Sequence, residues 1–173
     1  SRAQESGSII GWGAMTIAPP GDLEHIEAVA AGLIHSLALK QDGTLAAWGS
    51  NHYGQTTLPS PNEHFTAVAA GLYHSLGLKD DGTIVAMGYN DNGQCDVPQA
   101  AAGFIAMAAG QFHSLGLTTD GSVLAWGGNG SGQCDVPAPD SGFVAVAAGQ
   151  FHSLGLKADG TIVGWGWNEY GQC

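Results

Sequence analysis

A repeat of 39 residues runs through the chain and constrains its fold more than any other feature. A His-Ser pair begins at His35, His74, His113 and His152, always 39 residues apart. Four further motifs keep that spacing: Ala-Ala-Gly, Asp-Gly, Gly-Gln and Trp-Gly, the last with Met87 in the Trp position of the second copy. Short units of this kind bury their hydrophobic faces by stacking on one another. The spacing therefore predicts a repeat architecture.

Each unit has the pattern of four short strands, as the third unit illustrates. Phe104 to Ala109 is apolar, His113 to Thr118 alternates leucine with other residues, and Ser122 to Gly127 is a third β-like run. Asp120-Gly121 is a hairpin signal because primed turns favour residues that tolerate positive φ. Gln133 to Val136 predicts a short fourth strand. Four strands in a unit of this length are typical of one propeller blade.

Helical repeats fit the sequence less well, because Gly and Asp-Gly interrupt every unit and 28 of the 173 residues are Gly. The paired alanines before each Gly suit an innermost strand at a crowded hub. The predicted fold class is all-β, a β-propeller of four-stranded antiparallel blades.

Phase of the repeat predicts the organisation of the domain. Ser8 to Gly13 resembles a third strand without a first or second, so about four blades follow an N-terminal half blade. We expect a partial ring, either truncated or completed by another copy, with exposed terminal blades that self-associate. The predicted segments are a flexible tail at 1–7 and a single propeller domain at 8–173, with a half blade at 8–20 and repeats at about 25–61, 62–100, 101–139 and 140–173.

Charge narrows the possible partners. The chain has 15 acidic side chains and 4 cationic ones, for a net charge of −11. Binding to nucleic acid requires clustered cations that neutralise phosphates, and four scattered ones cannot supply them. The same argument excludes anionic membrane surfaces.

The repeated histidines and cysteines do not predict a metal site, a cofactor or catalysis. Equivalent side chains of neighbouring blades are too far apart to reach one zinc ion or form a disulfide. We expect the histidines to hydrogen-bond to a neighbouring turn or blade, and Cys95, Cys134 and Cys173 to be free thiols at the blade rim, with an intermolecular bridge through Cys173 as the alternative. No common catalytic motif is present, so we expect no enzyme.

The motif Ala-Ala-Gly-x-x-His-Ser-Leu-x-Leu-x-x-Asp-Gly-x-x-x-x-Trp-Gly-x-Asn-x-x-Gly-Gln resembles the repeat of the regulator of chromosome condensation family. The resemblance covers about residues 8–173 and implies a propeller. The Gly-Gln-x-x-x-Pro ending is similar to that of bacterial members, including propeller-type β-lactamase inhibitory proteins. Those members imply protein binding through aromatic side chains of the loop between strands one and two.

Two loops vary between units while the framework stays fixed, and both open on the same face of an up-and-down blade. They present aromatic side chains with Asn and acids, the composition of a protein-binding surface. The alternative is that these aromatics only cap the blade ends. The candidate partner-binding residues are Ile34, Tyr73, Phe112 and Phe151 in an inner arc, and Tyr53, Tyr89, Asp91, Trp167, Glu169 and Tyr170 outside it.

The favoured function is a non-enzymatic protein-interaction module that inhibits or scaffolds a partner protein. Two alternatives remain open: a guanine nucleotide exchange factor for a small GTPase, as the family's namesake implies, and a carbohydrate-binding lectin. The expected compartment is secreted or periplasmic, in a bacterium.

Overall fold

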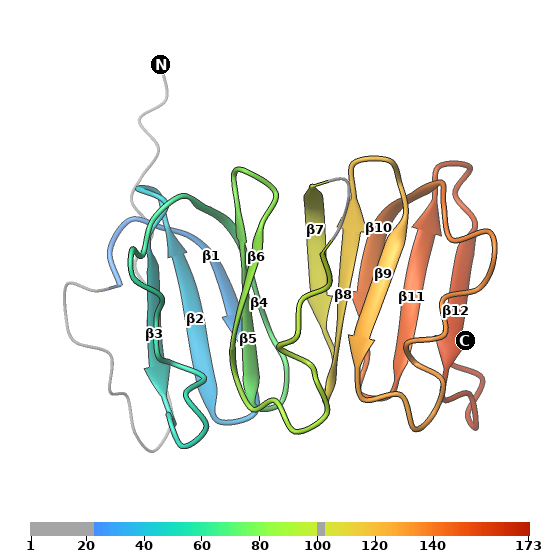
Figure 1. Cartoon of the computed structure of the whole chain (residues 1–173), viewed down its shortest axis with the longest axis horizontal. Helices are drawn as coiled ribbons and strands as arrows, with labels where there is room; N and C mark the ends of the chain where they lie inside the picture. The colour runs from blue at the N-terminus through green and yellow to red at the C-terminus, as the bar shows by residue number, and fades with distance from the viewer. Residues whose placement is uncertain (1–22, 100–102) are drawn as a thin grey trace.

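The computed structural model describes residues 23–99 and 103–173, which form an all-β structure (Figure 1). No helix in that part of the chain is long and apolar enough to span a membrane. The strands are β1 (Ile26–Ala31), β2 (His35–Lys40), β3 (Leu45–Gly49), β4 (Phe65–Ala70), β5 (His74–Lys79), β6 (Ile84–Gly88), β7 (Phe104–Ala109), β8 (His113–Thr118), β9 (Val123–Gly127), β10 (Phe143–Ala148), β11 (His152–Lys157) and β12 (Ile162–Gly166).

Each repeat folds into one antiparallel sheet, which we call a blade. Blade 1 is β1-β2-β3, and blades 2, 3 and 4 follow in chain order with the same topology. Register is repeated as well: Ala109 pairs with Ser114 and Phe104 with Thr118 across β7 and β8, with an irregularity between Phe104 and Ala106. The same motif in each unit therefore produces the same sheet.

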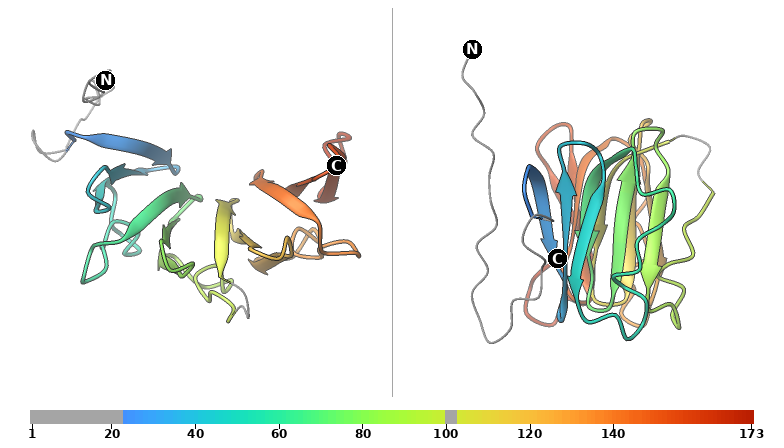
Figure 2. Two further views of the ribbon diagram at one scale, coloured as in Figure 1. Left: turned by 90° about the horizontal axis from the view of Figure 1, so that it is seen from above. Right: turned by 90° about the vertical axis from the view of Figure 1, so that its left-hand side faces the viewer.

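The four blades stand side by side as an open arc around a hub (Figure 2). The first strand of each blade is innermost, as the paired alanines predict. A hollow of about 300 Å³ at the hub is lined by the ends of these strands and the residues after them, including Ala70, Gly71, Ala109 and Gly110. The predicted propeller architecture is confirmed.

The predicted fourth strand does not form, and each blade has three strands. Gln133 to Val136 is a turn followed by an extended segment. Its backbone bonds within the turn and to side chains instead of to a neighbouring strand. Asp135 N–H donates to Gly132 C=O at 3.0 Å, Cys134 N–H donates to Asn129 Oδ1 at 2.8 Å, and Gln133 C=O accepts from the Ser153 hydroxyl at 2.9 Å. The sequence pattern marked an ordered segment but assigned it the wrong structure.

The predicted tail at 1–7 and half blade at 8–20 lie outside the described residues.

The hydrophobic core lies between blades. Leu115, Leu117 and Val123 of blade 3 pack against Phe143 and Trp165 of blade 4, and all five are buried. Burying one side chain of this kind contributes about 1.5–3 kcal/mol. Equivalent clusters join blades 2 and 3 and blades 1 and 2, so each interface holds its neighbours in a fixed orientation.

Candidate functional site

The two variable loops of every blade lie at the same edge of the arc, which we call the loop edge. In blade 1 they are residues 32–34, between β1 and β2, and the segment that begins at Ser50 after β3. The antiparallel order places the Asp-Gly turns at the opposite edge, which we call the hairpin edge.

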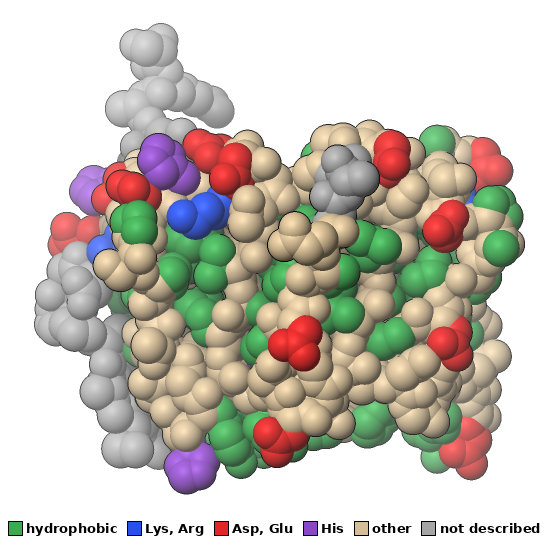
Figure 3. Space-filling model, in the orientation of Figure 1, with side chains coloured by type: hydrophobic (Ala, Val, Ile, Leu, Met, Phe, Trp, Pro, Cys, Tyr) green, Lys and Arg blue, Asp and Glu red, His purple; other side chains and the backbone are tan. Residues whose placement is uncertain are grey.

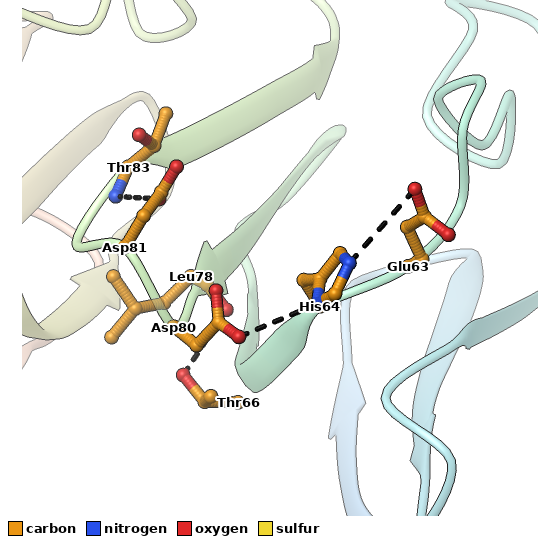
Figure 4. A network of polar contacts seen from close by, with 7 residues as sticks. All are labelled: Glu63, His64, Thr66, Leu78, Asp80, Asp81 and Thr83. Atoms are coloured by element: carbon orange, nitrogen blue, oxygen red, sulfur yellow. Dashed lines mark hydrogen bonds and ion pairs between the residues drawn. The ribbon is translucent and has the colours of Figure 1, made fainter.

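At the hairpin edge the repeated aspartates shape turns. Asp81 Oδ1 accepts the backbone N–H of Thr83 at 2.9 Å, which lowers the pKa of that carboxyl (Figure 4). His64 lies nearby between Glu63 and Asp80, with Nδ1 3.4 Å from the Asp80 carboxylate. The described turns therefore have a structural role, as the sequence predicts.

Aromatic side chains form two clusters along the loop edge. In the first, the ring centroids of Tyr53 lie 5.2 Å from Tyr73 and 5.1 Å from Tyr89, and Tyr89 lies 5.9 Å from Phe112. Together with the second cluster and Ile34 these residues make up the aromatic surface. Its members are Ile34, Tyr53, Tyr73, Tyr89, Phe112, Phe151, Trp167 and Tyr170.

The second cluster belongs to blade 4. Trp167 lies 6.1 Å from Phe151 and 5.2 Å from Tyr170 between ring centroids. Between the two clusters, blade 3 has Gly128 and Gly130 where blades 2 and 4 have larger residues. A methyl group on Gly130 would have no atom within 4 Å, whereas one on Gly128 would lie 3.1 Å from the carbonyl oxygen of Phe112, so the gap in the aromatic surface is open to solvent at Gly130.

Exposure along the aromatic surface is graded. Tyr170, Ile34 and Tyr53 are 80%, 45% and 42% exposed. The other five members are half-buried. Each of these five side chains packs on neighbouring loops with one part of its surface and is exposed to solvent with the rest. They therefore cap the ends of the blades and are also accessible to a partner. Leu33, 59% exposed beside Ile34, was not among the candidates, although it varies between units in the same way.

Acidic side chains lie among the aromatics. Asp91 and Glu169 are exposed at the loop edge, and the loss of hydration around Tyr89 together with the Asp91 carboxylate raises the pKa of that phenol. The sequence interpretation missed Asp96 and Asp135, which accept hydrogen bonds from Asn90 and Asn129 at 2.8 and 2.7 Å. Their six-residue spacing from an Asn in two units was the available signal.

Hydrogen bonds hold the long loops in shape. Asn90 Oδ1 accepts the N–H of Cys95 at 2.7 Å, and the buried Gln94 accepts the N–H of Asn92 at 3.1 Å through Oε1. Equivalent bonds recur in the other blades. A loop that is ordered before binding loses little entropy when a partner docks.

Cations gather at the hairpin edge. Lys40, Lys79 and Lys157 each end the second strand of a blade, and no other Lys or Arg occurs in residues 23–99 and 103–173. Figure 3 shows the blue atoms at the upper edge, among red acidic ones, and along the lower, loop edge it shows hydrophobic atoms with scattered acids and no blue atoms. The two edges therefore differ in charge composition.

The repeated histidines link blades. His74 Nε2 lies 3.0 Å from Ser114 Oγ, and the Ser114 hydroxyl donates to Gln94 C=O at 2.9 Å. Because the one hydroxyl proton goes to Gln94, His74 must donate from Nε2, which leaves buried Nδ1 unprotonated. The predicted hydrogen bond to a neighbouring blade is confirmed. The same pair recurs as His35–Ser75 and His113–Ser153.

The cysteines are free thiols, as expected. Cys95 and Cys134 donate to backbone carbonyls at 3.4 Å, and burial raises the pKa of each to about 11. Such thiols are poor nucleophiles. Residues 23–99 and 103–173 hold no group of three His, Cys, Asp or Glu residues able to bind a metal ion.

A sequence model described as the regulator of chromosome condensation (RCC1) repeat matches the chain four times. The matches cover residues 26–55, 65–94, 104–133 and 143–172, one for each blade. No protein of curated function matches the sequence.

Solved structures with the same fold include Prp20p of Saccharomyces cerevisiae, at 22% identity and a TM-score of 0.73 over 86% of this chain and 46% of that one. Yeast Prp20 in its complex with Kap60 has 23% identity and a TM-score of 0.74 over 91% of this chain and 46% of that one. The ectodomain of the receptor kinase CR4 of Physcomitrella patens has 27% identity and a TM-score of 0.72 over 87% of this chain and 43% of that one. The chain thus spans less than half the length of these relatives. The expected bacterial origin is not tested by these matches.

Proposed function

This chain belongs to the regulator of chromosome condensation (RCC1) repeat family, and we propose that it is a protein-interaction module that binds a partner through the aromatic surface, without catalysis of its own. RCC1-like propellers are mostly binding and regulatory folds, and one yeast relative was characterised for its binding to Gsp1p and histones. That relative has the same fold, and the partners named for it are not assigned to this chain.

The continuous contact of Tyr53, Tyr73, Tyr89 and Phe112 across three blades carries the proposal. Rigid aromatic side chains supply contact area at low entropic cost and dominate binding energy at many interfaces. Their loops are ordered by internal hydrogen bonds, so the surface is ready to dock. This arrangement supports binding of a protein better than binding of a small molecule, since its members lie on an edge and not in a deep pocket.

A peptide-display selection tests this function. The library is panned on the wild-type chain and counter-selected on a Tyr73→Ala, Tyr89→Ala, Phe112→Ala variant whose fold is checked by circular dichroism. We expect peptides that bind the wild type at least about tenfold more tightly than the variant. Binders that do not distinguish the two proteins, or no binders at all, would remove the aromatic surface as the site.

The exchange-factor and lectin alternatives rest on the resemblance and on composition. No contact or cavity in the described part of the chain favours either over protein binding.

Self-association is a second proposal and concerns a different surface, the outer face of blade 4. Leu156 is 37% exposed and Ile162 66%, whereas the equivalent Leu117 and Val123 of blade 3 are 0% and 2% exposed beneath blade 4. An apolar face of this kind favours contact with another copy.

A further inference from the structure

Aromatic rings at the two edges differ in whether the chain supplies them with a cation. At the hairpin edge, Lys157 Nζ lies 3.6 Å from the centroid of Phe143, and Lys79 Nζ lies 5.1 Å from that of Phe65. Lys157 is tethered there, since its amine also donates to the carbonyl of Pro139 at 3.0 Å. The aromatic surface has no Lys or Arg beside it among the described residues, because every lysine described lies at the other edge, and its one histidine neighbour there, His52, has its ring 4.9 Å from that of Tyr53.

Carboxylates accompany the aromatic rings at the loop edge. Asp91 and Glu169 are exposed, one beside each aromatic cluster, and Asp96 and Asp135 add charge in the same loops. Asn90 and Asn129 hold the latter two in place by donating hydrogen bonds to their carboxylates. The negative face of each ring and the nearby carboxylates attract the same kind of ligand, a cation.

We propose that the aromatic surface recognises a basic protein segment, with Arg or Lys side chains placed over its tyrosine and tryptophan rings and beside Asp91 and Glu169. This inference rests on the proposed function and adds the chemistry of the partner. Arginine suits such a site because its guanidinium stacks on aromatic faces and pairs with a carboxylate at once.

Competing partner chemistries fit less well. An acidic segment would meet four carboxylates without a cation to neutralise them, and like charges brought together at an interface oppose binding. An uncharged apolar segment would use the rings but leave Asp91 and Glu169 without partners. The net charge of −11 also steers basic partners toward the molecule, although the position of the aromatics decides where they bind.

Fluorescence anisotropy with a labelled arginine-rich peptide tests the proposal against a peptide in which citrulline, a neutral isostere, replaces each arginine. We expect the citrulline peptide to bind at least about tenfold more weakly. Raising the salt from about 50 to 500 mM weakens only the arginine peptide, because the shorter screening length reduces its attraction to the carboxylates. Equal affinity of the two peptides, or no binding of the arginine peptide, overturns the proposal.

Matched variants separate local recognition from general attraction to an acidic chain. An Asp91→Asn, Glu169→Gln variant loses two charges at the loop edge, and an Asp80→Asn, Asp140→Asn variant loses two at exposed positions near the hairpin edge. We expect the first to weaken the arginine peptide about fivefold or more and the second less than twofold. Equal losses would show attraction to net charge alone and would contradict the proposal.

Tyr53→Leu, Tyr73→Leu tests the role of the rings, because leucine keeps apolar area and removes the aromatic face. We expect weaker arginine binding, and unchanged affinity would contradict stacking. The display selection keeps the two proposals apart. If the selected peptides bind only the wild type but are not enriched in Arg or Lys, protein binding stands and the basic partner is ruled out. If no selected peptide binds the wild type more tightly than the variant of Tyr73, Tyr89 and Phe112, both proposals are ruled out.

Discussion

Glycines of the second strand lie beneath a phenylalanine ring of their own blade. A methyl group at Gly116 would be 2.4 Å from Cε1 of Phe104, inside van der Waals contact, and the same holds for Gly155 beneath Phe143. Blade 1 has Ala38 and Ile26 at these positions. In blade 1 the larger residue on the second strand, Ala instead of Gly, thus occurs with a smaller residue on the first strand, Ile instead of Phe. This indicates that the combined volume of the two side chains is limited.

Gly116→Ala therefore destabilises the protein by about 1–3 kcal/mol, because the ring must move within a packed interface. In a Phe104→Ile background the same change costs much less, since that pair reproduces blade 1. Chemical denaturation of the four proteins in the cycle measures the coupling, expected to be about 1 kcal/mol or more. Additive effects of the two substitutions would show that the ring does not limit the space at Gly116.

At the scale of the structural elements, neighbouring blades are joined by their interfaces. Each of the three interfaces in the described structure has a buried series of hydrogen bonds, from a His ring to a Ser hydroxyl and from that hydroxyl to a Gln carbonyl. Burial, followed by nearby histidines, lowers the pKa of His74 and His113 to about 4. Protonation would place a charge and an unpartnered N–H at Nδ1, which has no hydrogen-bond partner among the described residues. The neutral ring is the form that the interface accepts.

The pH dependence of stability follows from this. The unfolded chain binds protons on these histidines near their ordinary pKa of 6.5, and the folded chain binds them only near 4. Their contribution is thus complete above about pH 6.5 and is lost as the pH falls toward 4, by about 1.4 kcal/mol per pH unit for each histidine. Urea denaturation at several pH values measures the slope.

A His74→Gln, His113→Gln variant is the control, because glutamine retains an N–H near the position of Nε2 and does not titrate. We expect a shallower slope between pH 4 and 6.5. An unchanged slope would assign the acid sensitivity to other groups.

At the scale of the whole molecule, the arc ends on the outer face of blade 4. Ala145, Leu154, Leu156 and Ile162 line a shallow hollow of about 200 Å³ there. In blade 3 the equivalent face packs against Phe143 of the next blade. Within the described structure, blade 4 is therefore stabilised by a neighbouring blade on one side only.

A polypeptide of these 173 residues is expected to form dimers or larger assemblies through this face. Ile162→Glu shifts the population toward monomer because it places a charge in the apolar contact. Ile105→Glu, at a residue that is also exposed (53%) but lies on the innermost strand of blade 3, does not. Light scattering across a concentration series measures both, and a wild-type chain that stays monomeric contradicts the proposal.

Sequence periodicity alone was enough to predict the blades, the innermost alanine strands, the histidine bonds and the edge on which the aromatics lie. Side chains that alternate along a strand and turn residues at fixed offsets are local signals, and their recurrence every 39 residues strengthens each of them. The segment after the third strand was wrongly assigned as a fourth strand because its backbone bonds to the side chain of Asn129 in the turn before it and to Ser153 in the next blade, and the second contact is not visible in the sequence. Only the tertiary structure could place Tyr53, Tyr73 and Tyr89 in contact and separate the lysines from them, because those relations depend on how one blade is oriented on the next.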